Sequence, residues 1–131
     1  MRKQCHNPYM PLWEHVPDGE PHVFGDRLYV FGSHDLENGN EFCEQDYVCW
    51  SAPVTDLSDW RCDGVIYKKE QDPYNQDALP LYAPDVVKGP DGRYYLYYCI
   101  KFQDSINVAV CDTPAGEYRF YGRVHYAVSY T

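Results

Sequence analysis

The sequence is poor in several features that mark specialised classes of protein. It has only 11 lysines and arginines against 20 acidic residues, a net charge of −9. Nucleic acids and anionic membrane surfaces attract basic patches, so neither is expected as a partner. No apolar run approaches the roughly 20 residues of a membrane span, and none follows the basic start Met1-Arg2-Lys3 as in a secretory signal. These absences predict a cytoplasmic protein.

Cysteine and histidine patterns typical of metal sites are also lacking. None of the six cysteines lies in a Cys-x-x-Cys pair. A chain of this length can form an apolar core without disulfides, so reduced thiols are favoured over disulfide bridges. The five histidines show no metal-ligand spacing. Neither a metal nor a cofactor is therefore predicted.

Aromatic residues, in contrast, are abundant and include 14 tyrosines. Tyrosine-rich runs favour strands, and their rings either pack in a core or stack against sugars. No period of 3.6 residues is sustained, so long helices are not expected. Turn residues bound eight predicted strands in two sets of four: 21–24, 27–33, 46–51 and 61–67, then 84–88, 93–101, 105–111 and 118–124. The polar segment 68–80 between the sets is predicted to be a loop.

One short pattern occurs twice. Pro17-Asp18 and Pro84-Asp85 each precede an apolar strand, a Gly/Asp turn, an arginine and an aromatic strand. The pattern predicts that the two aspartates are equivalent in two four-stranded repeats. Such repeats recur radially in β-propellers, where the first strand of every blade lines a shared axis. We therefore predict an all-β fold, a partial β-propeller whose two carboxylates converge on one pocket, as in glycoside hydrolysis.

Longer stretches carry a family resemblance. They follow one another along nearly the whole chain: Pro17-Asp18, Val23 to Asp35, Trp50-Ser51, Asp56 to Trp60, and Tyr82-Ala83-Pro84-Asp85-Val86. Together they resemble glycoside hydrolase family 43. Residues 111–118 are similar to the turn that precedes the last strand of the family's second blade.

The resemblance implies a five-bladed propeller that hydrolyses xylo-, arabino- or galacto-configured glycosides with inversion. It implies that Asp18 is the general base and that Asp85 orients the general acid and tunes its pKa. The acid is a glutamate of the third blade, and this chain stops at Thr131 before that blade. Residues 1–131 are thus expected to be an N-terminal part, inactive alone, with blade one at about 18–67 and blade two at about 84–124.

The chemistry of inversion gives these roles a physical reason. One ionised carboxylate activates water while a protonated acid, about 6.5–9.5 Å away, protonates the leaving oxygen. A negative aspartate beside the acid raises the acid's pKa by like-charge repulsion and keeps it protonated. The alternative for Asp18 and Asp85 is a turn residue at the start of a strand.

Four further residues are candidates for substrate binding. His34 and Asp35 end the second strand and either line the pocket or form a surface pair. Tyr82 replaces a tryptophan of the family and is predicted to stack on sugar. Trp50 is either a sugar platform or a blade-packing residue. Glu20 is close to Asp18 in sequence, too close to flank a glycosidic bond from the opposite side.

Three classes of function follow, with a carbohydrate as the expected partner. The first is the inverting glycosidase, and the second is a sugar-binding propeller without catalysis. The third is a retaining enzyme of the invertase and levansucrase type, which needs an Asn-Asp-Pro element. The only Asp-Pro step here, Asp72-Pro73, is preceded by Gln71. If the chain did turn over substrate alone, Glu20 or Glu44 would be the acid.

Overall fold

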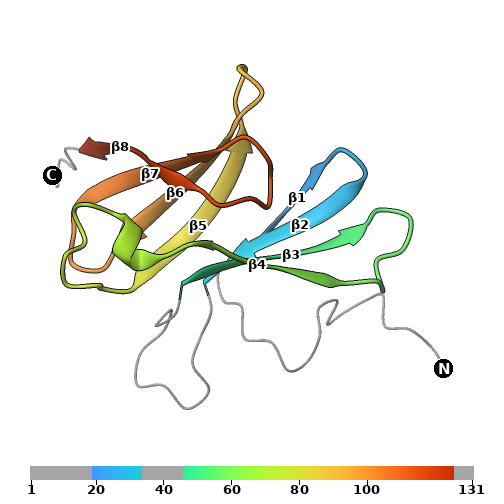
Figure 1. Ribbon diagram of the computed structural model, residues 1–131, viewed down its shortest axis with the longest axis horizontal. Coiled ribbons are helices and arrows are strands. Elements are labelled where there is room, and N and C mark those ends of the chain that lie inside the picture. The colour runs from blue at the N-terminus through green and yellow to red at the C-terminus, as the bar shows by residue number, and fades with distance from the viewer. Residues whose placement is uncertain (1–18, 34–45, 126–131) are drawn as a thin grey trace, which may run out of the picture.

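The computed structural model describes residues 19–33 and 46–125. They form two four-stranded antiparallel sheets in which sequence neighbours pair, as in the blades of a propeller. Figure 1 shows the sheets as two ribbon groups, blue to green and yellow to red. The strands are β1 (Glu20–Phe24), β2 (Arg27–Gly32), β3 (Tyr47–Pro53), β4 (Arg61–Tyr67), β5 (Leu81–Lys88), β6 (Tyr94–Ile100), β7 (Ser105–Cys111) and β8 (Arg119–His125).

All eight predicted strands are confirmed, with small shifts at their ends. The largest shift is in β5, which was predicted to begin at Pro84 and begins at Leu81. Proline cannot donate a ladder hydrogen bond, and the strand accommodates it with a β-bulge between Tyr82 and Asp85. The predicted loop 68–80 contains one 3₁₀ turn, η1 (Lys69–Gln71).

The core lies between the two sheets. In β6, alternate side chains from Tyr94 to Ile100 are buried, while Tyr97 is exposed, as a strand with one covered face requires. β5 lies against β1 and β2 of the first sheet. Each large side chain buried there contributes about 1.5–3 kcal/mol of hydrophobic stabilisation. The first strands of the two sheets are thereby held side by side.

The opposite face of the second sheet remains open. Val87, Tyr97 and Tyr121 are 50%, 40% and 57% exposed, and they line a groove of about 670 Å³. In the first sheet, by contrast, Tyr29 and Phe31 belong to the core cluster shared with the second sheet. Stacked repeats bury such faces only against a neighbour, so the second sheet exposes the kind of surface that the first sheet buries.

Two further observations concern the described part of the chain. No helix in it is long and apolar enough to cross a membrane. Its cysteines, Cys49, Cys62, Cys99 and Cys111, are free thiols. Cys5 and Cys43 lie outside the described residues.

Candidate active site

Asp85 lies within β5, and its side chain is 58% exposed. It directly follows Ala83 and Pro84, which make the β-bulge. Ala83 has a φ of 49°, in the left-handed region, where a residue with a Cβ atom costs roughly 1–2 kcal/mol. Such strain persists only where the surrounding structure enforces it, and it is often found at functional sites. The bulge therefore fixes how the Asp85 backbone is presented.

A cavity of about 290 Å³ lies beside this bulge. Its lining residues are Glu20 of β1 and Ala83, Pro84 and Asp85 of β5. The two carboxyl groups come from different sheets and meet because the first strands are neighbours. The cavity is thus acidic and lies at the junction of the two sheets.

Strand register shows which residues occupy equivalent levels. Glu20 pairs with Phe31 in the first sheet, and Asp85 pairs with Tyr97 in the second. When the arginines that open the aromatic strands of the two repeats are aligned, Phe31 and Tyr97 correspond. Glu20 is therefore the residue at the level of Asp85.

Asp18 itself lies outside the described residues, so its predicted equivalence with Asp85 stays a prediction. The two hairpins differ in the turn between their first two strands. It contains only Gly25 and Asp26 in the first sheet and the five residues 89–93 in the second. Because turn length fixes register in a hairpin, residues at the same level of the two sheets cannot be matched by counting along the two motifs alone.

His22 of β1 contacts Asp85 across the junction. Its Nε2 lies 2.6 Å from Asp85 Oδ1, and the imidazole donates this hydrogen bond when Nε2 carries the proton. The same oxygen accepts the Val86 backbone N–H at 2.9 Å. No role was predicted for His22 from the sequence. The sequence did contain an indication that His22 faces the second sheet. His22 lies two residues before Phe24 and so shares its strand face, and the Phe24 ring packs against the core.

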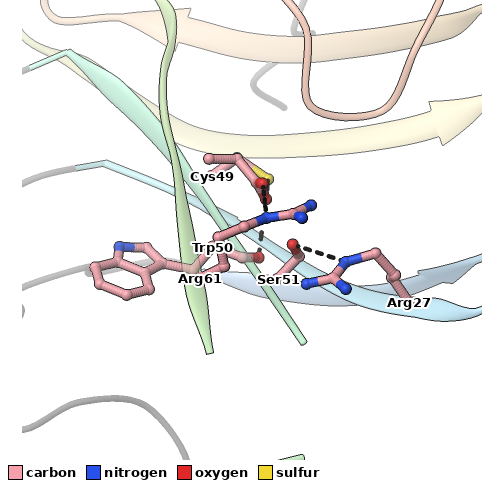
Figure 2. Close-up of polar contacts among 6 residues, drawn as sticks. Arg27, Cys49, Trp50, Ser51 and Arg61 are labelled. Carbon is pink, nitrogen blue, oxygen red and sulfur yellow. Dashed lines mark hydrogen bonds and ion pairs between the residues drawn. The ribbon is translucent and has the colours of Figure 1, made fainter. Parts of the chain in front are cut away.

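Two predicted sugar-binding residues are described, and neither lines the cavity at Asp85. Tyr82 is half-buried in β5, and its carbonyl accepts the Tyr47 hydroxyl at 2.8 Å. Trp50 is 7% exposed in β3. Its neighbour Cys49 belongs to the core, so Trp50 points to the opposite face of the first sheet, as Figure 2 shows.

Polar contacts surround Cys49 on its side of the sheet (Figure 2). Its thiol lies 3.7 Å from Asp63 Oδ2, and Arg61 Nε pairs with the other oxygen of Asp63 at 2.8 Å. Burial raises the pKa of the Cys49 thiol, and the Asp63 charge raises it further. A thiol that stays protonated is a poor nucleophile, so Cys49 acts in packing.

Other predicted site residues lie outside the described residues: Asp18, His34, Asp35 and Glu44. Their roles stay predictions. The last described residue before His34 is Ser33, whose hydroxyl donates to the Leu81 carbonyl at the start of β5.

A second carboxyl group is buried rather than exposed. Asp72 is 2% exposed, and its Oδ2 accepts the Tyr98 hydroxyl and Asn107 Nδ2, the latter at 2.6 Å. Its Oδ1 accepts the Tyr74 backbone N–H at 2.7 Å. Burial and the hydrogen bond with Asp72 both raise the pKa of Tyr98. The cluster ties the connector between the sheets to β6 and β7.

Two antiparallel meanders packed through their first strands define a partial β-propeller, the predicted fold class. The GH43_1 enzyme from Xanthomonas citri, solved in complex with xylotriose, superposes with a TM-score of 0.69 at 26% identity, covering 86% of this chain and 33% of that one. The sequence model of the Glycosyl hydrolases family 43 matches residues 15–130. The chain therefore belongs to this family.

Two characterised relatives are similar over most of the chain. A xylosidase/arabinosidase of Thermoclostridium stercorarium is 63% identical over 97% of this chain and 27% of its own length. Xylosidase/arabinosidase 43A of Humicola insolens is 33% identical over 82% of this chain and 36% of its own length. The chain thus spans only about a quarter to a third of these relatives.

Proposed function

We propose that the full-length protein containing this chain is a glycosidase that cleaves xylose- or arabinose-type glycosides with inversion. The observation that carries this proposal is the exposed carboxylate of Asp85 in an acidic cavity where the two sheets meet. Membership of family 43 and the names of the two relatives support it. The substrate partner is then a plant-type carbohydrate.

In this proposal Asp18 is the general base and takes a proton from the attacking water. The general acid is a glutamate supplied by the rest of the full-length protein. Inversion needs these two groups on opposite faces of the sugar, with room for water between them. Glu20 lies beside Asp85 and is not assigned the role of the acid.

Asp85 acts on the acid through its charge. Its side chain is 58% exposed and lines the cavity between the two sheets. A negative charge near the glutamate disfavours a second negative charge there and so raises the pKa of the acid. The acid then stays protonated near neutral pH, where it can protonate the leaving oxygen.

The direct test uses the purified full-length protein with aryl xyloside, arabinofuranoside and galactoside substrates. We expect turnover of the xyloside or the arabinofuranoside, with proton NMR showing an inverted anomer in the early product. Retention of configuration would contradict the mechanism, and preference for the galactoside would change the substrate. Sugar binding without turnover would favour the non-catalytic propeller. The cytoplasmic location stays a prediction that cell fractionation can check.

A further inference from the structure

We propose that His22 is a positioning residue that holds the Asp85 carboxylate in place across the junction of the two sheets. The proposal rests on the role assigned to Asp85 above and adds a residue that acts through it. His22 comes from the first sheet and Asp85 from the second, so their contact links the site to the packing of one sheet on the other.

The contact selects one oxygen of the carboxylate. Both hydrogen bonds, from His22 Nε2 at 2.6 Å and from the Val86 N–H at 2.9 Å, reach Oδ1. No described residue donates a hydrogen bond to Oδ2. The arrangement leaves that oxygen for the substrate or the general acid. The two hydrogen bonds also restrict rotation of the Asp85 side chain, which is 58% exposed to solvent.

The imidazole is itself held by aromatic packing. His22 stacks on Phe24 with ring centroids 5.8 Å apart and planes 16° apart. Phe24 in turn meets the edge of Tyr94 of β6 at 5.0 Å. A chain of three rings therefore runs from the buried face of the second sheet back to Asp85, and His22 cannot turn away without losing the stacking contact.

Precise placement of Asp85 matters because its proposed action is electrostatic. The interaction between two charges falls with their separation, so a carboxylate that moves among rotamers would tune the acid weakly. Glu20 adds a second acidic group on the same cavity. Repulsion between the two acidic groups would push the Asp85 side chain away from Glu20. A hydrogen-bond donor such as His22 holds the Asp85 carboxylate in place against that repulsion. A hydrogen bond to a charged group is stronger than one between neutral groups.

The test compares three substitutions of His22 in the full-length enzyme. His22→Phe keeps a ring to stack on Phe24 and removes the donor, and we expect kcat to fall on the order of tenfold with little change in KM. His22→Gln keeps an N–H at similar reach and should retain most of kcat. His22→Asn carries the same amide on a shorter side chain and should behave as His22→Phe does. If His22→Phe fails to fold, the contrast between Gln and Asn decides.

A double-mutant cycle separates action through Asp85 from action elsewhere. His22→Phe should cost nothing further in an Asp85→Asn background. Tyr95→Phe is the matched control, because it removes a hydroxyl that bonds Asp91 at the far hairpin of the same sheet; its kcat should equal that of the wild type. Additive losses, or wild-type kcat in His22→Phe while Asp85→Asn is impaired, would overturn the role of His22 and leave the proposed function standing.

A spectroscopic measurement tests the contact without using activity. In protein labelled with ¹⁵N-histidine, the His22 signals are those missing in His22→Gln, and Asp85→Asn should shift the Nε2 resonance. An unchanged resonance would show that the contact is not formed in solution and would overturn the inference. If instead the resonance shifts while Asp85→Asn keeps full activity, the contact stands, but the catalytic role of Asp85 fails, and with it the positioning role of His22.

Discussion

Asp72 and Asp85 lie close together in sequence, yet their surroundings differ in almost every respect. Asp72, in the connector before β5, is 2% exposed and accepts hydrogen bonds on both oxygens from three partners. Asp85, within β5, is 58% exposed and accepts bonds on Oδ1 alone among the described residues. Strand β6 separates the two environments, because Tyr97 pairs with Asp85 while Tyr98, the next residue, bonds Asp72.

The difference shows how to divide structural from functional carboxyl groups. A buried group must be fully hydrogen-bonded, since leaving it unsatisfied costs more than the bonds gain. Asp72 meets this demand, because both of its oxygens accept hydrogen bonds. Those from Tyr98 and Asn107 join the connector to the second sheet. Asp85 has one oxygen that accepts no hydrogen bond from the described residues, its side chain is exposed to solvent, and a strained bulge precedes it. Only the second arrangement leaves a group that can act on a ligand.

The largest expected effect extends the comparison to the base. We predict that Asp18→Asn in the full-length enzyme lowers kcat by about 10²–10⁴-fold, as loss of a positioned acid or base does. The melting temperature should stay within a few degrees of the wild type. Steady-state kinetics on an aryl glycoside check the first value and thermal unfolding the second. Near wild-type kcat would remove Asp18 from the mechanism.

Asp72→Asn should break the structural half of the comparison. In one orientation the new amide nitrogen would face Asn107 Nδ2 and in the other the Tyr74 backbone N–H, donor against donor in both cases. We therefore expect a loss of about 2–3 kcal/mol in the free energy of unfolding. Urea unfolding of the full-length protein measures it. Asp77→Asn, an exposed change in the same connector, is the control and should have almost no effect. Equal stability of the two variants would mean that the buried cluster contributes nothing.

Asp85→Asn should sharpen the functional half. We expect kcat to fall on the order of tenfold with no loss of stability, the reverse of Asp72→Asn. Removing the negative charge lowers the pKa of the general acid, so the alkaline limb of the pH–rate profile should move to lower pH. A pH series of kcat/KM on the wild type and the variant checks the shift. An alkaline limb that stays in place would limit Asp85 to substrate positioning.

The smallest effect concerns an exposed aspartate at a hairpin tip. The Tyr95 hydroxyl, followed by the Arg93 backbone and side chain, lowers the pKa of Asp91 from 3.8 to about 2. Its contribution to stability is therefore complete above the ordinary pKa and is lost as the pH falls from about 4 towards about 2. Asp91→Asn should be slightly less stable than the wild type at pH 6, with the difference shrinking at pH 2.5. Thermal unfolding at both pH values measures it, and a constant difference would contradict the assignment.

Local patterns were enough to predict the strands, because alternation and turn residues are properties of short segments. The same patterns could not reveal the Asp72 cluster, whose partners Tyr98 and Asn107 lie 26 and 35 residues away. The sequence also predicted Asp85 as a site residue but not His22, 63 residues away. The correspondence of Glu20 with Asp85 was not predicted either, because strand register depends on how many residues each turn contains. Contacts between sheets thus need the fold, whereas the sheets themselves do not.

The left-handed backbone of Ala83 has a consequence for engineering this protein. Glycine adopts a φ of 49° without the clash that alanine has there, so Ala83→Gly would relieve strain in the native chain. It would also free the segment that presents Asp85 to sample other conformations. A search for heat-resistant variants would therefore be drawn to a position where gains in stability come at the expense of turnover. Screens of this protein should score both properties together.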